Sequence, residues 1–314
     1  MWTTSSSSVA TVSSAGTVTS GANGTATITA TSESASATAT VTVQDPPQIT
    51  TTSLPGVLVN SSYNQTLTQF GGDSPSTWSV ITGSLPRGLS LSPSNGRITG
   101  TATTVGSSTF TLQVRDTAGQ TVSREFTVSV YAPLVITTAS VPTNAVVGDE
   151  YSHSFGAFGG DGNYTWSISI GSLPGGLSLS LDGILSGTPT AVESAFFYVT
   201  VTSGDGQSNT SSSFQIDVYD PLEIIEPSPL RRGWVGLTLA REVTSAGAAY
   251  PYTWSISSGS LPDGLYIIPP NTIYYALIFG TPETAGTSTF TMRVTSKGQT
   301  AEKEFTITID PYPW

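Results

Sequence analysis

One pattern of residues occurs three times in this chain of 314 residues, and it restricts the fold more than any other feature. Each copy begins at a tryptophan, and Trp78, Trp166 and Trp254 are spaced by 88 residues. The motifs that follow keep the same order, with Leu-Pro-x-Gly-Leu at 85–89, 173–177 and 261–265, and Gly-Thr at 100–101, 187–188 and 280–281. Self-similarity at a fixed period indicates tandem copies of one structural unit. We therefore predict three domains of the same fold.

Two runs of alternating apolar and polar residues close each unit, such as 110–114 and 126–130 in the first copy. Alternation places one face of a strand in a core and the other in water. Short strands separated by turn signals predict a β-sandwich. Gly and Pro interrupt any helical pattern, and β-branched Thr and Val favour strands. The predicted fold class is all-β, and the fixed register of the tryptophans places them in sandwich cores rather than on sugar-stacking surfaces.

The order of these motifs resembles the "Putative Ig" repeats (He-PIG, cadherin-like) of bacterial and archaeal surface proteins. The motifs concerned are a Trp, then Leu-Pro-x-Gly-Leu, then Gly-x-(Ile/Leu)-x-Gly-Thr-Pro, then a Phe-Thr-x-x-Val strand, and they cover about residues 46–310. The resemblance implies tandem extracellular Ig-like modules that are usually non-catalytic.

Residues 1–44 do not follow the repeat. Val-Ala-Thr-Val at 9–12, Gly-x-Val at 16–18 and Gly-Thr-Ala-Thr-Ile at 24–28 resemble, in order, the second half of a bacterial Ig-like domain of group 2, the intimin and invasin type. Half a sandwich leaves its apolar face without a layer to pack against. Two interpretations stay open. Either the sequence is a fragment of a longer chain, or a neighbouring subunit supplies the missing strands by β-strand addition.

Proline marks each predicted boundary, which gives four parts: 1–44, 45–131, 132–219 and 220–314. Proline fixes its own φ and restricts the residue before it, so these joints are expected to be stiff and the domains to form a linear, semi-rigid rod. The terminal Asp310-Pro311-Tyr312-Pro313-Trp314 repeats the linker signature. Tyr312 and Trp314 are therefore candidate contacts for a further domain or subunit.

Composition excludes several classes of partner and chemistry. The net charge is −11, which argues against a nucleic-acid or anionic-membrane partner. Charged residues are 10% of the chain, against roughly 25% in average domains, and Ser and Thr take their place. The absence of Cys excludes a disulfide framework, a Cys nucleophile and thiolate metal sites. The sequence contains no apolar run of about 18 residues, so no membrane span is predicted. No signal peptide is visible at the start.

The third copy departs from the pattern at residues 267–279, which are longer and more apolar than the Ser-rich turns of the other copies. This segment is either a longer core hairpin or a hydrophobic contact patch for a partner. Nearby Tyr250 and Tyr252 add to the clustered tyrosines and keep carbohydrate binding open. The contact candidates in the segment are Ile267, Ile268, Tyr274 and Tyr275.

Few residues suggest site chemistry. His153 is the sole His, and without a Ser-His-Asp arrangement or a metal cluster it is expected to be a surface residue on a strand. An Asp-x-Asp-x-Asp-Gly loop is missing, so no cofactor is expected; weak Ca²⁺ candidates at domain junctions, by analogy with cadherin-like relatives, are Asp45, Asp73, Asp161 and Asp220. Asn-x-Ser/Thr sequons begin at Asn23, Asn60, Asn64, Asn163 and Asn209.

The leading hypothesis is a non-catalytic extracellular structural protein: a cell-surface stalk, an adhesin shaft or a filament subunit. Its expected partners are copies of itself or flanking Ig-like domains, and the incomplete N-terminal part is the expected acceptor. The alternative is a carbohydrate-binding accessory module of a secreted enzyme or a phage tail fibre, with surface glycans as ligands. An enzyme is not expected, because no constellation of acid, base and nucleophile is visible.

Overall fold

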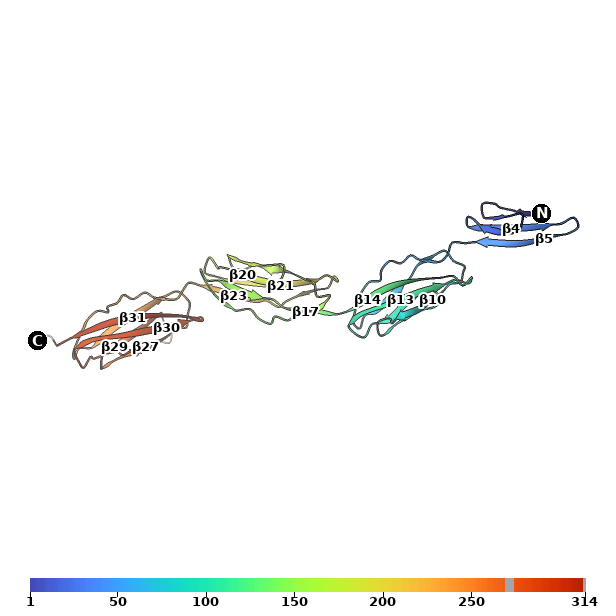
Figure 1. Ribbon diagram of the computed structural model, residues 1–314. Coiled ribbons are helices and arrows are strands. Elements are labelled where there is room, and N and C mark those ends of the chain that lie inside the picture. The colour runs from blue at the N-terminus through green and yellow to red at the C-terminus, as the bar shows by residue number, and fades with distance from the viewer. Residues whose placement is uncertain (269–273, 313–314) are drawn as a thin grey trace. The chain divides into compact units, whose positions relative to one another are not determined.

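A computed structural model describes residues 1–268 and 274–312, and every regular element in these residues is a β-strand (Figure 1). This confirms the all-β prediction. The chain divides into two compact units, Met1–Pro133 with Gly159–Asp161 and Leu134–Phe158 with Gly162–Trp314. In the described residues there is no helix of the length and apolarity needed to cross a membrane. The four-part division expected from the sequence stays a prediction.

The first unit begins with a small N-terminal part made of a three-stranded sheet and a two-stranded ribbon. The sheet has the order β1-β4-β5, and Figure 1 shows β4 and β5 side by side. The ribbon pairs β2 with β3. The bounds are β1 Trp2–Thr4, β2 Ala10–Val12, β3 Val18–Ser20, β4 Gly24–Thr31 and β5 Ser36–Val43.

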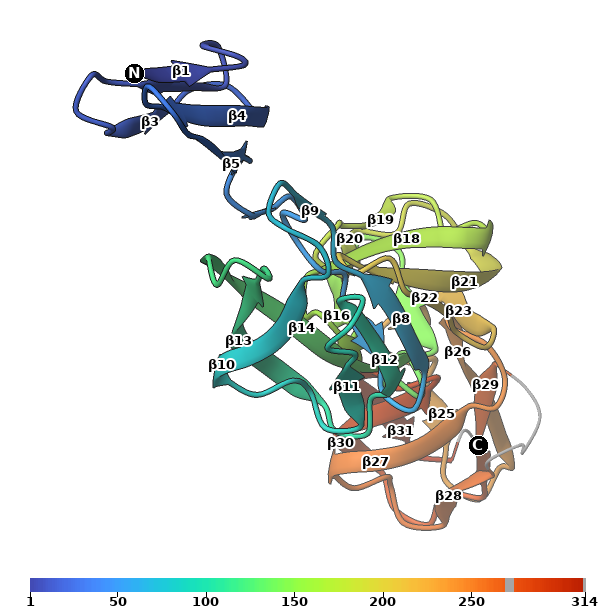
Figure 2. The same cartoon turned by 90° about the vertical axis from the view of Figure 1, so that its right-hand side faces the viewer.

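The rest of the first unit is a β-sandwich, repeat 1. One layer has the order β11-β12-β8 and the other contains β10-β13-β14, as Figure 2 shows. A short strand, β7, pairs in parallel with β14, and β6 pairs with β9. The bounds are β6 Gln48–Ile49, β7 Val57–Leu58, β8 Ser62–Thr66, β9 Gln69–Phe70, β10 Thr77–Gly83, β11 Leu89–Leu91, β12 Arg97–Thr101, β13 Gly106–Arg115 and β14 Thr121–Ile136.

The second unit contains the other two sandwiches. In repeat 2 the layers are β16-β20-β19 and β15-β23-β21-β18, with β22 added on β21. The bounds are β15 Asn144–Val146, β16 Tyr151–Ser154, β17 Ala157–Gly160, β18 Tyr164–Gly171, β19 Leu177–Leu179, β20 Ile184–Gly187, β21 Glu193–Ser203, β22 Ser208–Thr210 and β23 Phe214–Tyr219.

In repeat 3 the layers are β24-β26-β29-β28 and β25-β31-β30-β27. The bounds are β24 Glu223–Ile224, β25 Gly233–Trp234, β26 Leu239–Ala246, β27 Thr253–Gly259, β28 Leu265–Ile268, β29 Tyr275–Gly280, β30 Gly286–Ser296 and β31 Gln299–Asp310. β28 and β29 contain the described residues on either side of 269–273, which lie outside the description together with 313–314.

Each sandwich encloses its own core between its two layers. Trp78, Trp166 and Trp254 are all buried, which confirms their predicted place in the cores. Each tryptophan lies opposite a valine of the neighbouring long strand: Val114, Val201 and Val294. A bulge follows two residues later in all three repeats, a regularity that alternation of residue types does not reveal.

The C-terminal end of β14, residues 134–136, is held by side chains of repeat 2 and not by a sheet ladder alone. The Gln207 Oε1 atom accepts a hydrogen bond from the Leu134 amide at 2.9 Å, and the Asn209 Oδ1 atom accepts one from the Ile136 amide at 3.2 Å. Repeat 3 repeats part of this arrangement, since Gln299 Oε1 accepts from the Leu222 amide at 2.6 Å. The partners are more than 70 residues apart in the sequence, so no local pattern could predict them.

Candidate interaction surfaces

The N-terminal part has a thin core. Its buried apolar residues are Val9, Ala10, Ala26 and Ile28. The β2-β3 ribbon contributes to this core, but it covers only part of the sheet, because Trp2 on β1 remains 41% exposed. Ala37 and Ala39, which lie opposite Ala30 and Ile28 in register, are also exposed. A row of apolar side chains on one face of the sheet β1-β4-β5 therefore lacks a covering layer in the described residues.

The edge of the same sheet is the second notable feature. Within the described residues β5 pairs with β4 alone, so its backbone groups on the other side are open to pairing. A hollow of about 340 Å³ lies at the end of the sheet where β4 turns into β5, and Trp2, Ala30 and Ala37 are among the residues that line it. An open edge next to an uncovered apolar face is the arrangement that accepts a further strand.

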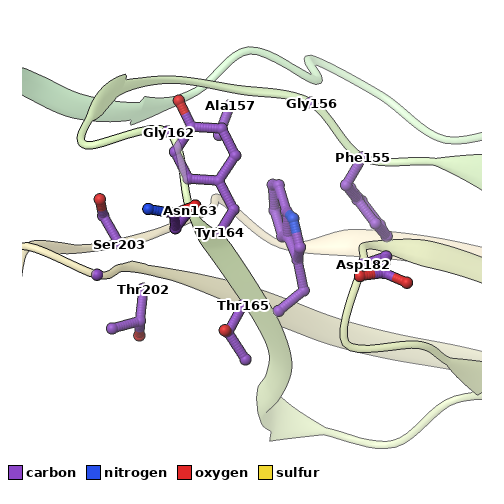
Figure 3. A pocket seen from close by; sticks show the side chains of 12 residues that line it. Phe155, Gly156, Ala157, Gly162, Asn163, Tyr164, Thr165, Asp182, Thr202 and Ser203 are labelled. Carbon is purple, nitrogen blue, oxygen red and sulfur yellow. The ribbon is translucent and has the colours of Figure 1, made fainter.

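Repeat 2 contains a hollow of about 850 Å³, whose lining residues are shown in Figure 3. The Tyr164 and Phe155 side chains lie on either side of it, Asp182 lies beside Phe155, and Ser203 lies at the far end (Figure 3). The Asn163 carbonyl accepts a hydrogen bond from the Gly204 amide at 3.0 Å, which continues the pairing of β18 with β21 beyond Tyr164 and Ser203. Asp182 is the one carboxylate among the lining residues, which does not provide the paired groups that acid–base catalysis uses.

In repeat 3, the contact candidates divide between two faces of the sheet. Ile267 points inward and packs against the core. Ile268 and Tyr274 are exposed, and Tyr275 is half-buried with its ring 5.9 Å from that of Tyr274. Tyr312 is exposed, whereas Trp314 and residues 269–273 lie outside the described residues. The structure thus places only part of the predicted patch on the surface.

His153 differs from the expected surface residue. It lies on β16, but its ring is half-buried and packs edge-to-face on Phe155 at 5.3 Å. Its Nε2 atom is buried, and in the described residues it has no hydrogen-bond partner. Desolvation by burial lowers the pKa of His153. This burial could not be predicted from the sequence, because the pattern of the strand does not show which face His153 lies on until the pairing register of β16 is known.

The acidic candidates for Ca²⁺ do not converge. In residues 1–268 and 274–312 no group of three or more acidic or His side chains could hold a metal ion. Asp45 instead accepts a hydrogen bond from Asn23 Nδ2 at 2.6 Å, and the Asp73 amide donates to the buried carboxylate of Asp116 at 3.2 Å. Both contacts stabilise loops. Sequence reasoning missed Asp116, whose burial depends on its position in the hairpin after β13.

The five sequons differ in how free their side chains are. Asn60 is exposed at a positive φ of 63°. Asn64 and Asn23 are exposed but hydrogen-bonded, with Asn64 Oδ1 accepting from Arg97 Nε at 2.7 Å. Asn163 is exposed, whereas Asn209 is half-buried and holds the Ile136 amide. Asn209 is therefore the sequon least suited to a glycan.

Comparison with known families gives the identity of the repeats. The family model described as "Putative Ig domain" matches residues 46–131, 132–219 and 236–310, and the "Bacterial Ig-like domain (group 2)" model matches residues 1–43. The first of these covers more than half of the chain. The chain therefore belongs to the Putative Ig domain family, with a bacterial Ig-like group 2 match preceding the three repeats.

Among curated proteins, the chain is similar to the "Serine-rich adhesin for platelets" of Staphylococcus aureus, at 34% identity over 149 residues. The same adhesin of strain MRSA252 is 33% identical over 149 residues. Each match covers 44% of this chain, and the matched part spans 6% of the first relative and 10% of the second. The similarity therefore concerns a small part of much longer proteins.

Solved structures of tandem Ig domains are also similar. The I-band fragment I67-I69 from titin matches at a TM-score of 0.48 and 16% identity, covering 86% of this chain and 99% of that one. Sidekick-1 immunoglobulin domains 1-5 match at a TM-score of 0.43 and 15% identity, covering 99% of this chain and 74% of that one.

Proposed function

We propose that this chain is a non-catalytic structural protein of the cell surface, the shaft of an adhesin or a subunit of a surface filament. Three consecutive Putative Ig domains and the similarity to a staphylococcal adhesin support this class. A composition rich in Ser and Thr and poor in charged residues also suits an exported β-protein. The proline-marked joints would keep consecutive sandwiches in line, so that strand ladders bear a load.

We further propose that the N-terminal part is completed in trans, by strands from another copy of the chain. The observation that carries this proposal is the combination of Trp2, Ala37 and Ala39 exposed on one face with the open edge of β5. Added strands would pair with the β5 edge and cover this apolar face, which forms the second layer that a sandwich requires. The small side chains of Ala37 and Ala39 would let a second layer approach closely.

Two substitutions on β5 test the trans completion. Ala39 and Thr40 are adjacent and both exposed, but they lie on opposite faces of the strand. We expect sedimentation equilibrium to show self-association of the full chain that Ala39→Lys abolishes, because a buried lysine charge opposes the second layer. Thr40→Lys should leave the association intact. A chain that stays monomeric, or two variants that behave alike, would overturn the proposal of trans completion.

Location is tested separately. Antibodies against repeat 3 should label intact cells of the source organism, and a protease added outside the cells should remove the label. Labelling that requires permeabilised cells would contradict a surface function while leaving the assembly question to the sedimentation experiment.

A further inference from the structure

The outer face of one sheet differs between the three repeats. The glycines Gly100, Gly187 and Gly280 pair with Leu89, Leu177 and Leu265, which gives the three copies the same register. The row of cross-strand partners one residue beyond this Leu–Gly pair can therefore be compared directly between the repeats. It is Ser90-Thr99-Asn64 in repeat 1, Ser178-Ser186-Ser152 in repeat 2 and Tyr266-Phe279-Ala240 in repeat 3. Hydroxyls and an amide in two copies are replaced by two aromatic rings in the third.

The difference continues along the sheet. The second row of repeat 3 is Ile268-Leu277-Glu242, where repeats 1 and 2 have Arg97-Thr66 and Ile184-Ser154. The third row pairs Tyr275 with Thr244. Since side chains alternate on a strand, Tyr275, Leu277 and Phe279 share one face over about 13 Å. We call Tyr266, Ile268, Tyr275, Leu277 and Phe279 the aromatic face.

These residues are not needed for the core of repeat 3. The opposite face of the same strands supplies that core through Leu265, Ala276 and Ile278, all buried. Tyr266 is 54% exposed, and its ring lies edge-to-face with that of Phe279 at 6.1 Å and 77°. The other two repeats lack this apolar face and still form the same fold. Its presence in repeat 3 therefore indicates a contact with another molecule.

A charged groove of about 420 Å³ borders the aromatic face through Leu277 and Glu242, and it extends toward Glu226 and Arg231. Glu226 is already engaged, since its Oε2 atom accepts from Thr244 Oγ1 at 3.2 Å. The Arg241 guanidinium donates to the carbonyls of Ala240, Arg231 and Arg232 at 2.8, 3.3 and 2.9 Å, which fixes one wall. Glu242 and Arg231 are exposed and line the groove.

We propose that the aromatic face and this groove form a glycan-binding site for β-linked oligosaccharides whose pyranose rings have equatorial hydroxyls. Such a ring has apolar C–H faces, which stack on aromatic side chains, and hydroxyls around its edge, which donate to a carboxylate such as Glu242 and accept from a guanidinium such as Arg231. The groove is within the size range of small-ligand sites, about 300–1,000 Å³. A protein interface core would be depleted in Glu, whereas Glu242 stands in the middle row.

This inference goes beyond the proposed function and does not depend on it. The aromatic face lies in the second unit and involves none of residues 1–44. Loss of glycan binding would leave self-association unchanged, and the β5 variants would leave glycan binding unchanged, so each failure can be recognised separately.

The test uses the full chain with cellohexaose and chitohexaose as probes in isothermal titration calorimetry. The repeats themselves provide the substitutions, because serine occupies both aligned positions in repeat 2. We expect the wild type to bind at least one probe, Tyr266→Ser with Phe279→Ser to weaken binding about tenfold or more, and Glu242→Gln to weaken it less. Phe196→Ser is the control, since Phe196 is 56% exposed and belongs to β21 of repeat 2.

The Tyr266→Ser single variant keeps the test valid if the double variant does not fold, because it removes an exposed ring. Binding of neither probe by the wild type would overturn the proposal, as would equal binding by the wild type and a folded Tyr266→Ser variant. Wild-type self-association that the Tyr266 substitution removes, without glycan binding, would identify the face as a protein interface and also overturn it.

Discussion

At the scale of the residue, the glycine of each Gly-Thr corner has little freedom to change. Gly187 has a φ of 141°, and a Cβ atom added to it would lie 2.1 Å from the carbonyl oxygen of Gly176. The same approach is found at Gly100 and Gly280. Two strands can meet this closely only where one of them lacks a side chain. The recurring glycine in the sequence is therefore explained by the distance between backbones.

A pair of alanine substitutions separates this close contact from backbone strain. Gly187→Ala should destabilise repeat 2 by more than about 2 kcal/mol, because it combines a positive φ with a steric clash. Gly206→Ala should cost about 1 kcal/mol, since Gly206 has a φ of 90° but nothing within 4 Å. Urea denaturation followed by tryptophan fluorescence measures both. Equal losses would show that the close approach at the corner does not matter.

His153 predicts a pH effect on stability. Its folded-state pKa is lowered by desolvation, so the unfolded chain binds the proton more readily. The stability of repeat 2 should therefore fall as the pH drops through the unfolded pKa, about 6.5, and recover above it. His153→Gln, which installs the residue found at the aligned position 65, should flatten thermal denaturation between about pH 5 and 7.5. An unchanged pH profile in this variant would contradict the role of the buried ring.

At the scale of the element, the structure explains which strand properties the sequence could predict. The alternation in 110–114 and 126–130 correctly predicted strands, and the tryptophan register correctly predicted the cores. The short parallel strands β7, β15 and β25 were not predicted, because they contain two or three residues and pair with distant partners. Period-2 patterns also do not say which faces are covered, so β5 and β13 look alike in sequence although only β13 is buried on one face.

The candidate sites also divide into features that the sequence predicts and features that depend on strand pairing. The apolar character of residues 267–279 was visible in the sequence, and it directed attention to Ile267 and Tyr274. The register instead places Ile267 inward and brings Tyr266 beside Phe279, two residues that are 13 positions apart. Pairing across a hairpin determines a surface, and the pairing depends on the whole sandwich.

The side chains that hold the C-terminal end of β14 give a test at this scale. Replacing Gln207 and Asn209 together by Ala removes both acceptors of the Leu134 and Ile136 amides. We expect a loss of about 1–3 kcal/mol, because each bond contributes about 0.5–1.5 kcal/mol. Hydrogen exchange at the two amides should quicken while exchange in β21 changes little. A variant as stable as the wild type would show that the ladder alone holds this strand.

At the scale of the whole molecule, stability is divided among separate cores. Each repeat has its own cluster of buried residues, and the N-terminal part has only Val9, Ala10, Ala26 and Ile28. Because stability grows with buried apolar area, residues 1–44 should be the least stable part of a single chain. Limited proteolysis of dilute protein should cut there first and leave a fragment close to 46–310. A first cut within a repeat would contradict this order of stability.

We propose that strands from another copy complete the sheet β1-β4-β5. Hydrogen exchange of the full chain over about a hundredfold range of protein concentration tests it most directly. We expect the amides of β5, residues 36–43, to become protected as the concentration rises, while those of β13 do not change. Exchange in β5 that stays the same at every concentration would contradict trans completion and leave β5 an open edge.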